Sequence, residues 1–206
     1  MKKIVLATLF LCLSAWNQAF AIPLGPTDDA FVSRINPGVN YGTNTSLITY
    51  QVSTSNVPTY LKFDLTGYTG FDSAVLWLYD YRGVGTATVN AYTVADTSWT
   101  ETTINYSNAP TRGTSFVSAT AATGQWVSWD VTSFANDAAG DLLSLVLTST
   151  GYIPSQSFYS KESTLTNLRP YLDITEIAPV PEPSTILLLG GGFLGFCLYR
   201  WKSKKA

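Results

Sequence analysis

The central part of the chain alternates apolar and polar residues with a period of two, which is typical of β-strands that bury one face. Within residues 60–65, Leu61, Phe63 and Leu65 share one face and Lys62 lies on the other. Similar segments, rich in Val, Thr and aromatic residues and separated by Gly, Asn, Pro and Asp, occur at 29–33, 46–52, 73–81, 86–94, 115–119, 125–131, 142–149, 156–161 and 170–177.

The number and length of these segments predict the fold class. About ten short strands, with one helical turn near 133–138, indicate an all-β fold in which two antiparallel sheets pack face to face. Long connections alternate with short ones, which favours a jelly-roll-like antiparallel β-sandwich. Alternation alone does not distinguish a jelly roll from an immunoglobulin-like sandwich, so that alternative stays open.

The N-terminus has the pattern of a secretory signal peptide. Two lysines precede an apolar run at 4–15, and the small residues Ala19 and Ala21 form a peptidase site. We expect cleavage after Ala21. Leu11 stands before Cys12, where a lipoprotein signal needs a small residue, so we expect no lipid attachment.

The C-terminus changes character after the last predicted strand. Pro179, Pro181 and Pro183 form a stiff linker that cannot join a sheet. An uncharged apolar segment at 186–199 follows, and then Arg200 and three lysines. The segment is short beside the roughly 20 residues of an ordinary membrane helix. Its basic flank nevertheless predicts a transmembrane helix with a cytoplasmic end.

These boundaries predict a signal peptide (1–21), a β-sandwich domain (22–178) and a C-terminal tail (179–206). The domain has six Lys and Arg residues against thirteen Asp and Glu, so we expect it not to bind nucleic acid, which requires clustered positive charge. Cys12 and Cys197 both lie outside the domain, which therefore has no disulfide.

The absence of histidine from the chain, and of cysteine from the domain, limits catalysis. It removes Ser-His-Asp triads, Cys-His pairs and histidine-ligated zinc. A glycosidase needs only two carboxylates, and Asp64, Glu101, Asp130 and Glu162 leave that alternative open. Catalytic motifs are otherwise missing, so we expect a non-catalytic protein.

Three features at the extreme C-terminus occur in a fixed order: Pro181-Glu182-Pro183, a glycine-interrupted apolar segment and a basic end. Together they resemble the PEP-CTERM sorting signal of Gram-negative bacteria. The resemblance implies an exosortase partner, a transient anchor in the inner membrane, and removal of the anchor near the motif. Delivery to the cell surface or the extracellular polysaccharide would follow.

The domain contains a series of short motifs in a fixed order: DDAFV at 28–32, NYGTN at 40–44, YLKFDL at 60–65, WTE at 99–101, NAP at 108–110, WDVT at 129–132, SKES at 160–163 and RPYL at 169–172. Together they resemble the DNRLRE domain, which is also classed as a carbohydrate-binding module with alginate-binding members. The resemblance implies a jelly-roll sandwich and, in some members, binding of acidic polysaccharide.

Binding of an acidic glycan requires cations on a rigid surface or aromatic rings that cover a sugar face. The alternative for each cation is an ordinary exposed ion pair, for example between Lys62 and Asp64 or Asp130. Trp126 is expected to point outward because it alternates with Trp129. The glycan-binding candidates are Lys62, Lys161, Arg169, Arg34 and Trp126.

A structural calcium ion is a further candidate. Asp28, Asp29, Asn40 and Asn44 supply oxygen atoms near the start of the domain, and calcium binds six to eight oxygens. No fixed ligand spacing is present, so we favour turn-capping roles for these side chains. No other cofactor is expected.

These observations favour a non-catalytic, exported protein that binds acidic polysaccharide at the cell surface or in the extracellular matrix. The alternative is a purely structural matrix or envelope protein without a specific glycan ligand. A polysaccharide-degrading enzyme is the third and least favoured hypothesis.

Overall fold

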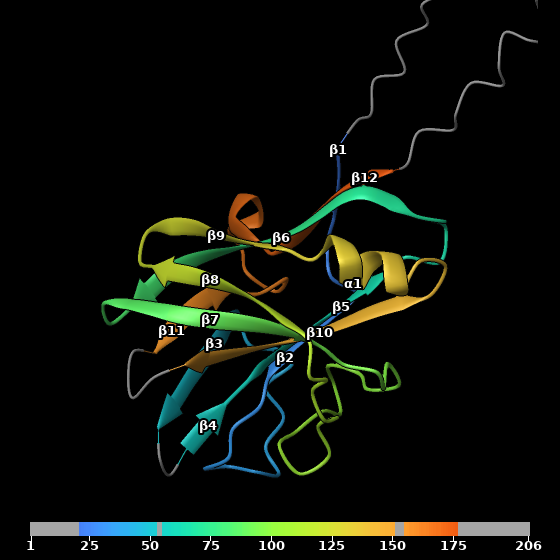
Figure 1. Ribbon diagram of the computed structural model, residues 1–206. Coiled ribbons are helices and arrows are strands. Elements are labelled where there is room, and N and C mark those ends of the chain that lie inside the picture. The colour runs from blue at the N-terminus through green and yellow to red at the C-terminus, as the bar shows by residue number, and fades with distance from the viewer. Residues whose placement is uncertain (1–20, 53–54, 151–154, 177–206) are drawn as a thin grey trace, which may run out of the picture. The chain divides into compact units, whose positions relative to one another are not determined.

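The computed structural model describes residues 21–52, 55–150 and 155–176 (Figure 1). The predicted signal peptide up to residue 20 and the predicted C-terminal helix and sorting motif lie outside these residues. None of the helices within the described ranges has the length and apolar character needed to cross a membrane.

The described residues are almost entirely β-structure, as the alternation predicts. All ten predicted strands are present, and the helical turn expected near 133–138 is a short α-helix. The elements are β1 (Ala21–Leu24), β2 (Asp28–Phe31), β3 (Ser46–Val52), β4 (Ser55–Val57), β5 (Thr59–Asp64), β6 (Phe71–Gly83), β7 (Thr86–Thr93), β8 (Phe116–Ala122), β9 (Gln125–Asp130), α1 (Thr132–Asp137), β10 (Leu142–Thr150), β11 (Gln156–Tyr159), the 3-10 turn η2 (Thr166–Leu168) and β12 (Tyr171–Glu176).

In this part of the chain the strands form two antiparallel sheets. The seven-stranded sheet has the order β1-β12-β6-β11-β3-β4, and β9 also pairs with β6. The five-stranded sheet has the order β2-β5-β10-β7-β8. The turn between β8 and β9 carries the chain from one sheet to the other (Figure 1). The fold is therefore an antiparallel β-sandwich, and its jelly-roll classification stays a prediction.

Sequence alternation missed β1 and β4. Both are short and stand at the two ends of the strand order of the seven-stranded sheet. Pro23 lies within β1, opposite Asp173 of β12, and proline is tolerated in an edge strand because one side needs no backbone donor. An edge position thus explains why the sequence of β1 does not read as a strand.

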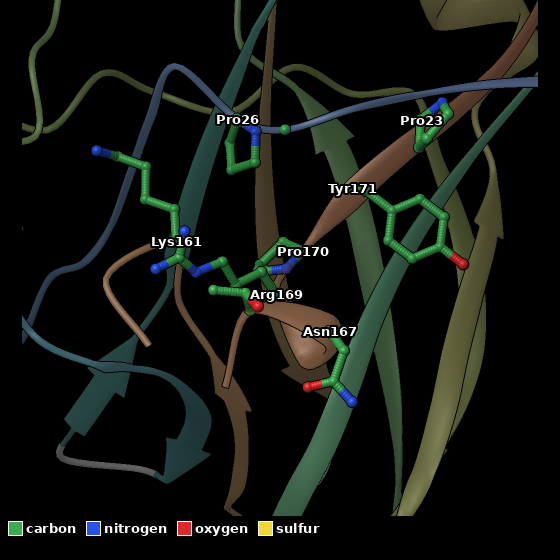
Figure 2. Close-up of a pocket in the computed structure, with 9 residues that line it drawn as sticks. Pro23, Pro26, Lys161, Asn167, Arg169, Pro170 and Tyr171 are labelled. Atoms are coloured by element: carbon green, nitrogen blue, oxygen red, sulfur yellow. The ribbon is translucent and has the colours of Figure 1, made fainter. Parts of the chain in front are cut away.

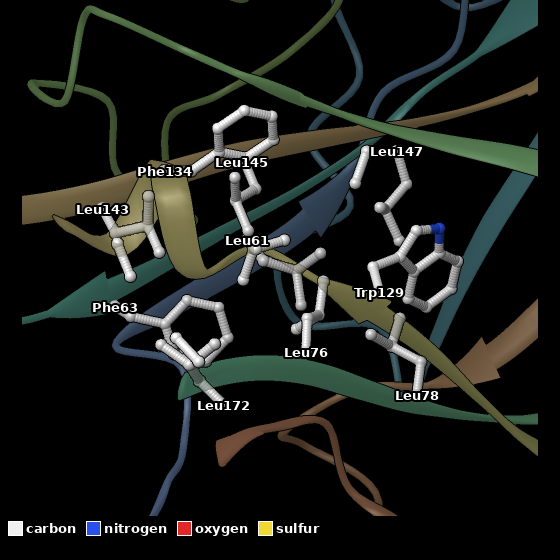
Figure 3. Packing of buried hydrophobic residues seen from close by; sticks show 14 of the residues in the cluster. Leu61, Phe63, Leu76, Leu78, Trp129, Phe134, Leu143, Leu145, Leu147 and Leu172 are labelled. Carbon is white, nitrogen blue, oxygen red and sulfur yellow. The ribbon is translucent and has the colours of Figure 1, made fainter. Parts of the chain in front are cut away.

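The main core lies between the two sheets, where the inward faces of their strands meet (Figure 3). Leu61, Phe63 and Leu65 are fully buried there, as the period of two predicts. Trp129 is 1% exposed, and its indole Nε1 donates a hydrogen bond to the carbonyl of Val89 at 2.9 Å. That bond satisfies the polar atom of the largest buried side chain.

A second apolar cluster lies on the opposite face of the five-stranded sheet. Tyr60, Trp99, Ile104 and Val146 belong to it, and the connection between β7 and β8 (residues 94–115) covers it. The indole Nε1 of Trp99 donates to Ser144 Oγ at 2.9 Å. Both faces of this sheet are therefore buried near the connection, whereas the sequence pattern predicted that one face would be exposed to solvent.

The loop between β2 and β3 holds this connection in place. Asn40 Nδ2 donates to the carbonyl oxygens of Glu101 and Ile104 at 2.6 and 2.7 Å. Gly42 lies so close to the connection that a Cβ atom there would be 1.9 Å from the Glu101 carbonyl oxygen. Only glycine permits this approach without a shift of the backbone.

Candidate functional site

Aromatic side chains gather on the outer face of the seven-stranded sheet. Along β6, Trp77, Tyr79 and Tyr81 point outward because they alternate with Leu78 and Asp80, which are buried. All of the outward rings are half-buried. Neighbouring strands add further rings, and we call the group the aromatic face: Trp77, Tyr79, Tyr81, Trp126, Tyr159 and Tyr171.

The rings of the aromatic face are in mutual contact across the strands. Tyr159 of β11 stacks on Tyr81 at 4.4 Å and on Tyr79 at 6.2 Å between ring centres. Trp126 of β9 meets Tyr79 and Tyr171 edge-on, each at 5.4 Å. Cross-strand aromatic pairs of this kind limit side-chain motion, so the face presents a fixed set of flat surfaces.

Trp126 confirms the predicted alternation, because it is half-buried on the outer face while Trp129 lies in the core. The other rings of the aromatic face were not named as candidates. The signal for them is the same period of two in 73–81, where Trp77, Tyr79 and Tyr81 occupy one parity.

A pocket of about 520 Å³ opens beside Tyr171, whose ring stacks on Trp77 at 6.3 Å between centres. Tyr171 therefore belongs to both the aromatic face and the pocket. Figure 2 shows Pro23 beside this ring and the Arg169 side chain extending away from it toward Lys161. The lining residues are Pro23, Gly25, Pro26, Lys161, Thr166, Asn167, Arg169, Pro170 and Tyr171.

Arg169 supplies a cation to this pocket. Its Nε donates to the carbonyl of Ser163 at 2.8 Å, which fixes the plane of the guanidinium. Within the described ranges Arg169 forms no ion pair, so its terminal N–H groups have no carboxylate partner there. A fixed guanidinium of this kind suits bidentate recognition of a carboxylate.

Lys161 also lines the pocket, but its charge is already balanced. Its Nζ lies 2.9 Å from Glu101 Oε1 and 2.9 Å from Glu162 Oε1. Burial opposes the charged form, yet the hydrogen bonds and charges of the two carboxylates raise the pKa of Lys161 above its ordinary value. Lys161 and Arg169 thus line one pocket, with Lys161 the weaker binding group.

Lys62 is not available as a surface cation, which corrects the sequence-based expectation. It lies off the main core face as predicted, but it is only 5% exposed because the 94–115 connection covers it. Its Nζ pairs with Asp28 Oδ2 at 3.1 Å and donates to the carbonyls of Thr97 (3.3 Å) and Trp99. It also lies 4.6 Å from the centre of the Trp99 ring.

Arg34 is exposed in the loop after β2 and is not among the residues that line the pocket beside Tyr171. Its backbone N–H donates to the carbonyl of Asn56 at 3.1 Å, which places it beside β4. The structure therefore brings two of the four candidate cations, Lys161 and Arg169, to one pocket.

The carboxylates that left glycosidase chemistry open have local partners. Asp64 Oδ1 accepts the N–H of Thr66 at 2.9 Å, and Asp130 Oδ1 accepts the N–H of Thr132 at 3.1 Å. These bonds lower the pKa of both aspartates. Both are therefore ionised turn caps, unsuited to act as a general acid.

The candidate cation ligands near the domain start separate into two groups. Asp28 pairs with Lys62 and accepts the N–H of Glu101 at 3.0 Å, while Asn40 accepts the N–H of Gly42 at 3.2 Å. For Asn44, the contact is through its carbonyl, which accepts Ser160 Oγ. Of these contacts, that of Asn40 with Gly42 is of the turn-capping kind that the sequence favoured.

Asp29 differs from the other three candidates. Its side chain lies with Glu101 and Glu162, with one carboxylate oxygen of each residue within 4.8 Å of the others. Burial, together with the nearby Glu162 charge, raises the pKa of Asp29 to about 8, although the N–H of Lys161 opposes the shift. Sequence spacing could not identify this cluster, because its members come from distant parts of the chain.

A β-sandwich with an aromatic face beside a fixed guanidinium has features that suit sugar binding. Comparison with known proteins agrees. The chain belongs to carbohydrate-binding module family 96, whose model matches residues 21–176. Residues 179–200 match the PEP-CTERM protein-sorting motif, which confirms that resemblance.

The chain is also similar to a small part of a curated protein. A gellan lyase from Bacillus sp. is 35% identical over 103 residues. The matched region is 47% of this chain but only 4% of the lyase, so the similarity concerns a small part of that protein.

Proposed function

We propose that this protein is an exported, non-catalytic module that binds acidic polysaccharide along the aromatic face, with Arg169 selecting for sugar carboxylates. The observation that carries the proposal is the continuity of the aromatic face with the Arg169 pocket through Tyr171. Membership of a carbohydrate-binding module family supports it.

The aromatic face suits a chain of sugar rings. A pyranose presents flat patches of C–H groups, which pack on aromatic rings and bury apolar surface on both partners. The aromatic face extends over four neighbouring strands, β9, β6, β11 and β12, so it can contact more than one sugar unit. The hydroxyl of Tyr79 donates to the carbonyl of Gly124 at 3.1 Å, which holds that ring on the sheet.

The preference for acidic sugars rests on Arg169. A guanidinium offers parallel N–H donors that match the two oxygens of a uronate, and this geometry is stronger than a contact with a neutral hydroxyl. The similarity of part of the chain to a gellan lyase makes gellan, beside alginate, a reasonable first ligand to test.

The C-terminal motif supplies the route to the surface. In this proposal the apolar tail holds the exported chain at the inner membrane, and the prolines present Glu182 to an exosortase. Cleavage near Pro181-Glu182-Pro183 then releases the domain to the cell surface or the extracellular polysaccharide. The match of residues 179–200 to the PEP-CTERM protein-sorting motif supports this step.

Isothermal titration of the full-length chain, purified in a mild detergent, tests the binding proposal. Alginate and gellan oligosaccharides should bind at low salt, and neutral glucan oligosaccharides should bind more weakly. The substitution Trp126→Ala should weaken the binding of every glycan. Arg169→Ala should selectively weaken the binding of the acidic glycans. Arg34→Ala removes an exposed arginine away from the pocket and is the matched control.

Two outcomes would replace the proposal. Absence of saturable binding to all of these polymers would favour a structural matrix or envelope role. A fall in polymer viscosity on incubation with the protein would instead show that it is a polysaccharide-degrading enzyme.

A further inference from the structure

Three carboxylates from separate elements meet at one partly buried place. Asp29 belongs to β2, Glu101 to the 94–115 connection, and Glu162 to the segment after β11. One oxygen from each lies within 4.8 Å of the others. Folding therefore collects three negative charges from segments that are far apart in sequence, which costs energy unless a cation balances them.

Two oxygens of this cluster have no protein partner. Asp29 Oδ1 and Glu162 Oε2 are buried and accept no hydrogen bond, and the Asp29 residue is only 1% exposed. The other oxygen of Asp29, Oδ2, accepts the N–H of Lys161 at 2.8 Å. Oδ1 is therefore the atom that is available to a further ligand. A buried carboxylate oxygen without a partner is costly, and a metal ion is a common partner for such an atom.

The charges of the cluster indicate the kind of ion. Lys161 contributes one positive charge against the three carboxylates, because its Nζ pairs with Glu101 and Glu162. With all three carboxylates ionised, as in a metal-bound site, the remaining charge is minus two, which a divalent cation neutralises. Carboxylate oxygens are hard ligands that favour calcium or magnesium over zinc or copper. Calcium is the better candidate of the two, because it accepts irregular sets of carboxylate oxygens, whereas magnesium demands near-octahedral geometry.

We propose that Asp29, Glu101 and Glu162 bind a calcium ion that links the five-stranded sheet, the 94–115 connection and the segment after β11. The ion would satisfy both orphaned oxygens. It would also steady the glycan pocket, because Ser163, whose carbonyl holds Arg169, follows directly after Glu162. The site is distinct from the aromatic face, and calcium binding does not depend on a glycan ligand.

The test is thermal unfolding of the metal-stripped full-length chain with calcium chloride or EDTA and no polysaccharide. Extracellular calcium sites have dissociation constants on the order of 10⁻⁴–10⁻³ M. At a calcium concentration about ten to a hundred times the dissociation constant, the expected rise in Tm is about 5 °C. Magnesium at the same concentration should give a smaller rise.

Matched substitutions locate the ion. Glu162→Gln and Asp29→Asn should abolish most of the calcium-dependent rise in Tm, whereas Glu176→Gln, which removes an exposed carboxylate on β12, should retain it. If the first two variants fold poorly, calorimetric titration of calcium into the metal-stripped wild type measures the affinity and the number of bound ions directly. One ion per chain is expected.

Two results would overturn the site. One is a wild-type Tm that is the same in calcium and EDTA, together with no calcium binding in the titration. The other is a full calcium response in folded Glu162→Gln and Asp29→Asn variants, which would place the ion elsewhere. Glycan binding is measured separately, so failure of the calcium site leaves the binding proposal standing.

Discussion

The outer face of the seven-stranded sheet carries six half-buried aromatic rings, whereas the outer face of the five-stranded sheet around β5 and β10 lies beneath the 94–115 connection. Trp126 and Lys62 both occupy positions that alternate with core residues, yet Trp126 reaches the surface and Lys62 does not. Strand periodicity therefore identifies which side chains point away from the main core. Whether those side chains meet water or a second layer depends on the long connections.

The largest expected difference between the two faces is in stability. Trp99→Ala removes a buried ring from beneath the connection, together with the hydrogen bond to Ser144. It should lower the free energy of unfolding by about 3–5 kcal/mol. Trp126→Ala on the aromatic face should cost far less. Chemical denaturation of both variants checks this, and equal losses would contradict the contrast between a covered and an open face.

The buried charge of the covered face gives the next largest effect. Lys62→Ala leaves the partly buried carboxylate of Asp28 without its partner and opens space beside Trp99. The expected loss is about 3 kcal/mol of unfolding free energy. Glycan affinity of the folded fraction should stay unchanged. A variant with normal stability and weakened glycan binding would instead show that Lys62 reaches the ligand.

Substitution of Arg169 should weaken glycan binding and leave the free energy of unfolding nearly unchanged. Arg169→Ala should weaken alginate or gellan binding about tenfold, which corresponds to about 1.4 kcal/mol. Arg169→Lys should recover only part of the loss, because an ammonium lacks the parallel donors. Titration calorimetry measures both. Equal weakening of neutral and acidic glycans would remove the selective role of Arg169.

The smallest predicted effect concerns Asp80, which is buried beneath the aromatic face between Tyr79 and Tyr81. Desolvation raises its pKa to about 6, although the N–H groups of Arg82 and Ser157 oppose the shift. The folded protein thus binds this proton more tightly than the unfolded chain does. Ionisation of Asp80 should therefore cost stability as pH rises from about 4 to 6.

Asp80→Asn isolates that cost, because the amide stays neutral and its oxygen can still accept the N–H of Arg82. Relative to wild type, the variant should gain stability as pH rises through this window. Urea denaturation at several pH values from 4 to 7 provides the comparison. Parallel stability curves for the two proteins would contradict a raised pKa.

Much of the fold could be predicted from sequence because alternation is a local property. Each predicted strand needs only its own residues to show a buried and an exposed parity, as 60–65 and 125–131 do. The sequence could not show that residues 94–115 return over β5. That contact depends on loop packing, including the approach of Gly42 to Glu101.

The candidate site was predictable in part for the same reason. Trp126 and the proximity of Lys161 to Arg169 follow from alternation and short sequence separation. The grouping of Asp29 with Glu101 and Glu162 does not, because its hydrogen bonds span 72 and 132 positions. Clusters built from such distant segments require the three-dimensional arrangement of the strands.

The four tryptophans in the described ranges allow the most direct test of the central claim, that the aromatic face binds polysaccharide. Their indole N–H signals can be followed by NMR while alginate or gellan oligosaccharide is added to the full-length chain. The signals of Trp77 and Trp126 should shift with saturation, while those of Trp99 and Trp129 should stay in place. Saturable shifts confined to Trp99, or none at Trp77 and Trp126 despite binding, would contradict the account.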